Sequence, residues 1–444
     1  MQLVAYGAQD IYLTGNPQIT FFKVVYRRHT NFAVESIVQT FNGTADFGKR
    51  VTATISRNGD LIQQMYLEVV LPVDAAAAAT RTWTYGVGNA LVSQAEIEIG
   101  GQLIDRQYGD WMNIWTELTI PAGKRNGYDD MVGNSLLANN GDQLGGIDAT
   151  AVVNSASDGV RLYVPFQFWF NRNPGLALPL IALQYHEVKL NLTLRPITDL
   201  IQNTNAAAVT GADASLSLST CKLYVDYVYL DTDERRRFAQ VSHEYLIEQV
   251  QFTGTETIAQ GDSNKNITLN FNHPVKELIW AHTTSTHASA PSATAGAGSW
   301  FNYSGLNAAA TTTGAGRDSF QTALLQLNGH DRFSVRNADY FRKVQNYEHH
   351  TRVPRVGADL AGTSADGCQS SFRQYIYSYS FALSPEEHQP SGTCNFSRID
   401  NAVLQMTYDK NTETNAQSLN LNIYAVNYNV LRIMSGMGGL AYSN

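Results

Sequence analysis

The sequence predicts an all-β protein of the sandwich or barrel class. Five segments alternate apolar and polar side chains with a period of two, the pattern of strands that bury one face. Stretches rich in Gly, Asn and Ser separate them, and Asn-Gly turn pairs begin at residues 58, 126, 140 and 328. Helical periodicity is confined to a few short segments. The alternating segments are Lys189–Leu194, Ser215–Ser219, Asn266–Phe271, Gln374–Phe381 and Ser418–Ile423.

Three short helical segments are predicted in the loops between strands. The first follows Asp110, its expected N-cap, because apolar residues recur there with helical spacing until Pro121. The second follows Asp231 and contains three consecutive arginines. The third is a single turn that begins at Ser384, which Pro385 and Glu387 follow as in helix N-termini. The apolar residues of the first segment are Trp111, Ile114, Trp115 and Leu118.

The two halves of the chain repeat each other, which predicts two β domains of the same topology. Short motifs of the first half return in the same order and at similar separation in the second half, and a terminal strand closes each half. The repeated pairs are Phe41–Thr44 with Phe252–Thr255, Ile97–Gly101 and Asp110-Trp111 with Leu325–Gly329 and Asp339-Tyr340, and Asn173–Gly175 with Pro390–Gly392. We expect an N-terminal arm at 1–30, a first domain at 31–230, a linker helix at 231–242 and a second domain at 243–444.

Length and composition limit the function classes. The 444 residues suffice for two domains, and a hydrophobic fraction of 43% with 16% charged residues argues against extensive disorder. The net charge of −8 disfavours a protein that binds nucleic acid directly, because phosphate neutralisation needs basic side chains. The three cysteines, Cys221, Cys368 and Cys394, form no disulfide framework or metal pair. We expect synthesis in a reducing compartment and no membrane anchor.

No pattern in the sequence predicts an enzyme, a metal site or a cofactor. Gly43–Arg50 matches a phosphate-binding loop but lacks the hydroxyl residue, and its flanks read as strands, so we expect a hairpin turn. Neither His186-Glu187 nor His243-Glu244 has the second histidine of a zinc protease helix. His349 and His350 are expected to form an exposed polar pair. The long stretch from Thr283 to Asp318 is expected to be a functional loop inside the second domain.

Two surface features are candidate sites. Arg235, Arg236 and Arg237 could bind phosphates or lipid headgroups, but we favour pairing with nearby acidic side chains or contact with a neighbouring subunit. Five N-x-S/T sequons occur, at Asn42, Asn191, Asn266, Asn302 and Asn395. Asn302 lies in the long loop and is expected to be the most accessible candidate for glycosylation.

Four segments closely resemble the major capsid proteins of nucleocytoplasmic large DNA viruses, above all those of large algal viruses. They are Gly7–Phe22 (GAQDIYLTGNPQITFF), Asn173–Val188 (NPGLALPLIALQYHEV), Gln389–Asp400 (QPSGTCNFSRID) and Val430–Tyr442 (VLRIMSGMGGLAY). The resemblance implies two consecutive eight-stranded antiparallel jelly rolls with short helices in the loops. It also implies a homotrimer whose six rolls mimic a hexagon, and capsomers that tile an icosahedral shell.

The resemblance further implies the place of each segment in the capsomer, the binding partners and the location of the protein. An arm from Val4 to Asn31 would lie beneath the capsomer, and the loop Thr283–Asp318 would form an outward tower. Partners would be further copies of the chain, neighbouring capsomers and minor capsid proteins, with an internal viral membrane nearby but not penetrated. The protein would be made and assembled in host cytoplasm and reside in the virion. Candidate assembly contacts are Phe21 and Phe22 in the arm and the three arginines at 235–237.

Two other functions stay open from the sequence. A carbohydrate-binding or glycoside-cleaving jelly roll would stack sugars on aromatic side chains; Trp111, Trp115 and Trp169 read as core residues, and Trp300 in the long loop is the exception. A glycan array would test this alternative. A minor capsid component of the same fold is the other alternative, and abundance in purified particles would separate it from a major one.

Overall fold

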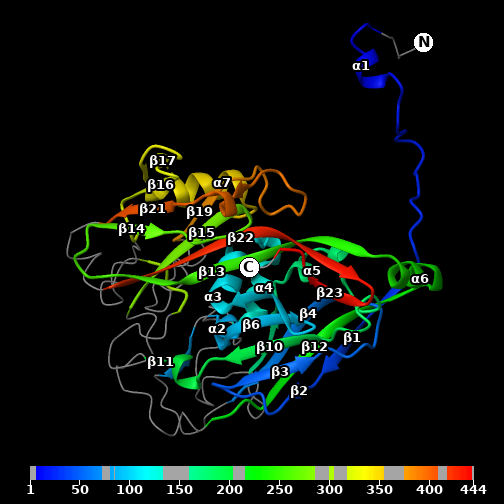
Figure 1. Ribbon diagram of the computed structural model, residues 1–444, viewed down its shortest axis with the longest axis horizontal. Coiled ribbons are helices and arrows are strands. Elements are labelled where there is room, and N and C mark those ends of the chain that lie inside the picture. Colours follow the sequence, from blue (N-terminus) through cyan, green and yellow to red (C-terminus); the bar gives the residue numbers. More distant parts are fainter. Residues whose placement is uncertain are drawn as a thin grey trace.

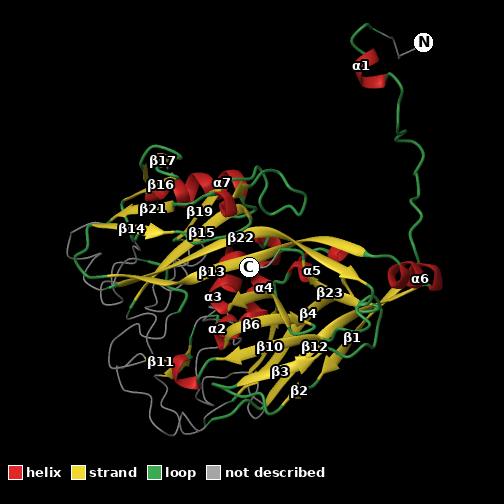
Figure 2. Cartoon of the chain, in the orientation of Figure 1, coloured by secondary structure: helices red, strands yellow, loops and turns green. Residues whose placement is uncertain are grey.

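The computed structural model describes residues 7–72, 81–84, 86–133, 160–203, 216–285, 300–304, 318–354, 375–408 and 418–442. Most of these residues lie in antiparallel strands, and short helices occupy the connections (Figure 2). The predicted all-β class is therefore confirmed.

The first half of the chain folds into two facing antiparallel sheets. One sheet has the strand order β1-β12-β4-β8, and the other has the order β3-β10-β6-β7, with the short β2 (Phe41–Asn42) at its edge. The eight strands are β1 (Phe32–Gln39), β3 (Arg50–Thr54), β4 (Leu61–Leu71), β6 (Val92–Ile99), β7 (Gln102–Tyr108), β8 (Val160–Pro165), β10 (Val188–Leu194) and β12 (Thr220–Leu230). Short strands β5 (Arg81–Trp83) and β11 (Ile201–Asn203) pair with each other, and β9 (Leu178–Pro179) pairs with β4.

The second half repeats this topology strand for strand. Its sheets have the orders β13-β22-β15-β19 and β14-β21-β16-β17. When the eight main strands of each half are counted along the chain, one sheet of each half has the order first, eighth, third, sixth and the other has the order second, seventh, fourth, fifth. The eight strands are β13 (His243–Ile258), β14 (Asn264–Thr268), β15 (Pro274–Thr284), β16 (Thr322–Leu327), β17 (His330–Asp331), β19 (Ile376–Ser380), β21 (Ala402–Thr407) and β22 (Leu419–Met434). The short strands are β18 (Arg336–Asn337), β20 (Cys394–Asn395) and β23 (Met437–Leu440). This arrangement is the double jelly roll that the resemblance implied.

Helices fill the connections of both rolls. α2 (Val87–Leu91), α3 (Gly109–Thr119), α4 (Ala122–Val132) and α5 (Trp169–Arg172) belong to the first roll, and η5 (Tyr340–Gln345) continues into α7 (Asn346–His349) in the second. α6 (Thr232–Gln240) lies between β12 and β13, at one end of the molecule in Figure 1. Single short turns are α1 (Ile11–Thr14), η1 (Pro174–Leu176), η2 (Ile197–Asp199) and η8 (Phe396–Arg398).

The sequence motifs for turns and caps are confirmed at several positions. Asn328 and Gly329 connect β16 to β17 with φ angles of 52° and 78°, the left-handed geometry that an Asn-Gly hairpin turn requires. The backbone of Gly43–Arg50 connects antiparallel β2 and β3, as expected of a hairpin. The Asp231 side chain accepts a hydrogen bond from Thr232 N and caps α6. The Asn-Gly pair at 140 lies outside the described residues.

Other local predictions are wrong. The N-cap of α3 is Tyr108, because the helix begins directly at the end of β7, and Asp110 lies in its first turn. The Asn-Gly pair at 126 lies inside α4, whose buried residues Arg125, Tyr128 and Val132 recur with helical spacing. Residues 216–219 form no strand, because Leu218 N donates to the Asp46 side chain. The segment at Ser384 is a turn without a helix, and its Glu386 side chain accepts a hydrogen bond from the distant Thr351 N.

Candidate assembly surfaces

The N-terminal arm, residues 7–31, stands clear of both rolls (Figure 1). It contains only the short α1, and all of its large apolar side chains are exposed, including Phe21 at 89% and Phe22 at 99%. An exposed apolar segment of this length on a folded chain is typical of an interaction site. The other exposed apolar residues of the arm are Ile11, Tyr12, Leu13, Ile19, Val24, Val25 and Tyr26.

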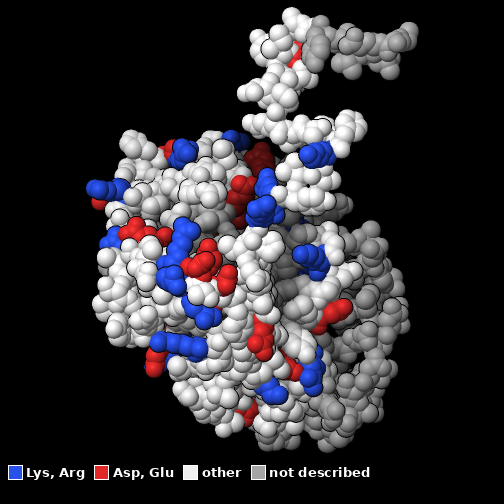
Figure 3. All heavy atoms as spheres, turned by 90° about the vertical axis from the view of Figure 1, so that its right-hand side faces the viewer, with Lys and Arg blue, Asp and Glu red and all other residues white. Residues whose placement is uncertain are grey.

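The arm continues into β1, the edge strand of its sheet. β1 pairs with β12 along its whole length, so its other edge presents unpaired backbone groups. Its side chains Phe32, Val34 and Val38 are 55%, 50% and 41% exposed. On the face that carries the root of the arm, Lys and Arg side chains alternate with Asp and Glu (Figure 3). The visible charges of this face therefore form no single basic field.

The three predicted arginines lie on α6, and the structure separates their roles. Arg235 Nη2 lies 3.1 Å from the Oδ2 of Asp60, a carboxylate that also accepts a hydrogen bond from Leu230 N. The arginine therefore ties α6 to the first roll, and its partner is not one of the acidic residues of its own helix. Arg236 and Arg237 are exposed. Phe21 and Phe22 lie in the arm, and the structure does not bring them together with these arginines.

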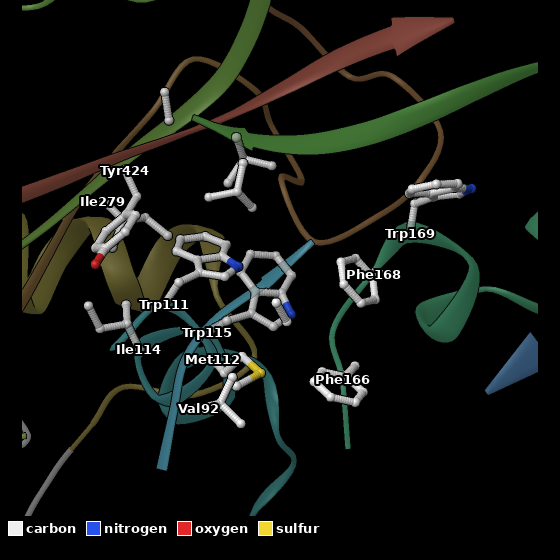
Figure 4. Close-up of a cluster of buried hydrophobic side chains, with 14 of the residues drawn as sticks. Val92, Trp111, Met112, Ile114, Trp115, Phe166, Phe168, Trp169, Ile279 and Tyr424 are labelled. Atoms are coloured by element: carbon white, nitrogen blue, oxygen red, sulfur yellow. The ribbon is translucent and has the colours of Figure 1, made fainter. Parts of the chain in front are cut away.

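The two rolls pack against each other through aromatic side chains. The Trp111 ring on α3 lies with its centroid 5.4 Å from that of Tyr424 on β22, and Tyr108 lies 5.0 Å from Phe252 on β13. Figure 4 shows Trp111 between Tyr424 and Trp115, with Ile279 next to Tyr424. Trp111 and Tyr424 are 0% and 1% exposed. The helical spacing of the tryptophans predicted a core position, but the partner residues on the second roll were not identified from sequence.

A cluster of buried charges crosses the same junction. Glu248 on β13 lies 3.1 Å from Arg172 of the first roll and 2.8 Å from the Nζ of Lys276 on β15. Burial alone would raise the pKa of Glu248, but Arg172, His388 and Lys276 outweigh it and hold the pKa at about 2. Nearby, Val250 N donates to Asp105 Oδ1 of the first roll, and burial raises the pKa of that carboxyl to about 7.

His350 is a second buried ionic site, which corrects the expectation of an exposed pair with His349. Its Nε2 lies 3.2 Å from Glu277 Oε2 and its Nδ1 lies 3.0 Å from Glu386 Oε1. The imidazole is buried because it lies between Glu277 on β15 and Glu386 in the turn after β19. Burial alone would lower the pKa of His350, but the two carboxylates outweigh it and raise the pKa to about 9.

We expect His350 to make stability depend on alkaline pH. The pKa of His350 is about 9 in the folded state, above the ordinary 6.5. The protonated imidazole therefore stabilises the fold fully below pH 6.5, and this stabilisation is lost as pH rises through 9. The free energy of unfolding should fall by up to about 3 kcal/mol across that window. Urea unfolding at pH 6.5 and pH 9.5 measures it. His350→Gln should flatten the pH dependence, whereas His330→Gln, on the exposed short strand β17, should not. Equal slopes in both variants would contradict the assignment.

The expectation of an accessible loop is wrong at residues 300–304, which are described and mostly buried. Trp300, the candidate sugar platform of the alternative function, is held against the first roll: the Arg195 guanidinium lies 3.9 Å from the centre of its ring, and its Nε1–H donates to Asp199 O. Asn302 is only 9% exposed, and its Oδ1 accepts a hydrogen bond from Ser304 N. Tyr303 anchors the segment through a hydrogen bond from Asn113 on α3. These residues bridge the rolls, and the rest of the proposed tower lies outside the described residues.

The described residues offer little chemistry beyond packing. No group of three or more His, Cys, Asp or Glu side chains among them is placed to hold a metal ion. Cys221 and Cys394 are unpaired thiols, and Cys368 lies outside the described residues. No helix in the described part is long and apolar enough to cross a bilayer.

Comparison with known proteins shows similarity along the whole chain. Residues 20–231 match the family model for the major capsid protein N-terminus, and residues 234–361 and 365–439 match that for the large eukaryotic DNA virus major capsid protein. The major capsid proteins of Pyramimonas orientalis virus and Phaeocystis pouchetii virus are 51% and 47% identical, over 100% of this chain and 99% of each relative. A quasi-atomic structure of the PBCV-1 virus capsid superposes with a TM-score of 0.74 at 39% identity, covering 96% of this chain and 100% of that one.

Proposed function

The chain belongs to the major capsid proteins of large eukaryotic DNA viruses, and from this membership we propose that it is the main building block of such a virus's outer shell. The observation that carries the proposal is similarity to major capsid proteins over the full length of both chains. The role is structural, and the protein works by association with other subunits without catalysing a reaction.

We propose that three copies form a homotrimeric capsomer of pseudo-hexagonal outline. Two rolls with the same strand order in one chain support this, because three chains then present six similar units around one axis. Such capsomers tile an icosahedral shell through contacts at their rims. The partners are further copies of the chain, neighbouring capsomers and minor capsid proteins.

We propose distinct tasks for the segments outside the rolls. The arm at 1–30, with its exposed Phe21 and Phe22, contacts neighbouring shell components, and the linker at 231–242 joins the rolls at 31–230 and 243–444. The absence of acidic residues between Ile11 and Val34, where Lys23, Arg27 and Arg28 occur, suits acidic partner surfaces. The shell would place the protein in the virion after assembly in host cytoplasm, near an internal membrane that it does not enter.

The solution mass of the purified chain tests the trimer. Light scattering after size exclusion should give three times the chain mass of 48.9 kDa, and this species should persist on dilution, because obligate interfaces are large and apolar. A chain that starts at Phe32 is the matched control and should also have three times its own, smaller chain mass, since the arm is proposed to act between capsomers. A stable monomer of the full chain would contradict the trimer.

A further inference from the structure

One outer sheet face is covered by another part of the chain, whereas no described residues cover the equivalent face of the other roll. Ile279 and Tyr424, on the outer face of the sheet β13-β22-β15-β19, are 0% and 1% exposed because α3 of the first roll lies against them. Tyr66 and Tyr224, on the outer face of the sheet β1-β12-β4-β8, are only half-buried. Their neighbours Met65 and Leu223 fill the core of that roll, so the two tyrosines point outward.

The strand registers show that these two faces are equivalent. Tyr424 is paired with Ile279 on one side and Phe252 on the other, and Tyr224 is paired with Tyr66 and Val38 in the same way. Both sheets also have an irregularity at the same place, where the pairing skips Gln63 in the first roll and Lys276 in the second. Tyr66 and Ile279 each follow this irregularity by three residues.

The element that covers the second-roll face also has a counterpart. The motif Asp110-Trp111 at the start of α3 repeats as Asp339-Tyr340 at the start of η5. Trp111, Trp115 and Leu118 are buried on α3. The residues at the same spacing in η5 and α7 are Tyr340, Val344 and Tyr347, of which Val344 is 40% and Tyr347 is 78% exposed.

We propose that the surface formed by Tyr340, Val344 and Tyr347 of one copy packs on Tyr66 and Tyr224 of a second copy. This contact repeats between chains the contact that Trp111 makes with Tyr424 within one chain. The contact joins two different surfaces, and each copy carries both of them. Copies therefore associate head to tail, and three such contacts close a ring. The inference rests on the proposed capsomer, in which three copies close a ring of six rolls.

The receiving face has room for the incoming side chains. An open groove of about 610 Å³ runs beside Tyr66 and is lined by Tyr163, Met131 and Pro165. Tyr66 stacks on Tyr224 with ring centroids 5.1 Å apart and meets the Tyr163 ring edge-on at 6.1 Å. Clustered tyrosines and a methionine around a groove are typical of the buried centre of protein interfaces. Tyr347 is the most exposed side chain of the proposed partner surface and fits such a groove.

Cross-linking between engineered cysteines tests the contact. A chain that carries both Tyr340→Cys and Tyr224→Cys, treated with a short bifunctional thiol reagent, should migrate as a covalent trimer on a denaturing gel. Either single substitution should give no more cross-linking than the unmodified chain, because the contact joins unlike surfaces. Tyr224→Cys combined with Met437→Cys, which is 52% exposed on the hairpin tip, is the matched control and should stay uncross-linked.

A charged variant gives an independent readout. Val344→Asp with Tyr347→Asp should shift the species in light scattering from trimer to monomer while leaving the thermal unfolding of the monomer unchanged, because both residues are exposed in the single chain. Met437→Asp should keep the trimer. A trimer that survives Val344→Asp with Tyr347→Asp, or that gives no cross-link in the double cysteine variant, would overturn this contact and leave the capsomer proposal intact. An unmodified chain that stays monomeric would overturn the capsomer itself.

Discussion

Replacing Glu248 with Gln is expected to lower the free energy of unfolding by about 3–5 kcal/mol, because the change leaves buried cations without their counter-charge. The Lys276 side chain is 0% exposed with its Nζ 2.8 Å from Glu248, and Arg172 of the first roll lies 3.1 Å from the same carboxylate. The depressed pKa of about 2 means that the carboxylate stabilises the fold above its ordinary pKa of 4.5 and loses this contribution as pH falls through 2. Urea unfolding at pH 7 measures the loss.

A substitution in the same strand provides the control for Glu248. Glu244 lies at the start of β13 and forms an ion pair of 2.9 Å with Arg432, but the two side chains are 60% and 51% exposed. Glu244→Gln should therefore cost less than about 1 kcal/mol, since solvent screens exposed pairs. Combining Glu248→Gln with Lys276→Met should cost less than Glu248→Gln alone, because one of the stranded charges is removed. Equal losses for Glu248→Gln and Glu244→Gln would contradict a buried junction.

Two β domains of one topology could be predicted from the residues because the main signals are local, whereas the jelly-roll fold was implied only by the family resemblance. Period-two alternation identifies Lys189–Leu194 and Ser418–Ile423 as strand segments, which lie in β10 and β22, and an Asn-Gly pair marks the turn at Asn328. The repeat of short motifs then shows that one topology occurs twice. None of these signals needs knowledge of contacts between distant residues.

The junction between the rolls could not be predicted, because alternation reports that a face is buried and not what covers it. Glu248 and Lys276 read as ordinary charged residues of strands, yet both are buried, and Arg172 of the first roll is one of the groups that pair with Glu248. Trp300 and Asn302 sit in a Ser-, Ala- and Gly-rich stretch that reads as a solvated loop, yet Asn302 is only 9% exposed and the adjacent Tyr303 is 1% exposed. Composition gives no sign of such anchoring by a few aromatic residues.

Trp111→Ala is expected to destabilise the chain by about 3–5 kcal/mol, the range for truncating a large aromatic side chain in a packed core. Trp111 is 0% exposed and contacts rings from both rolls, with centroid distances of 5.4 Å to Trp115 and 5.4 Å to Tyr424. The cavity would lie at the junction, so both rolls lose contacts and neither can close the space alone. Denaturant unfolding followed by tryptophan fluorescence and by circular dichroism measures the loss.

Trp111→Phe separates ring packing from the indole N–H. The Nε1–H of Trp111 has no hydrogen-bond partner among the described residues, so Phe keeps an aromatic ring between the rolls and removes an unsatisfied donor. Trp111→Phe should therefore lower the free energy of unfolding clearly less than Trp111→Ala does. Tyr12→Ala, 92% exposed in the arm, should leave unfolding unchanged. If Trp111→Ala cost no more than Tyr12→Ala, α3 would not hold the rolls together, and the same contact could not be the one repeated between copies.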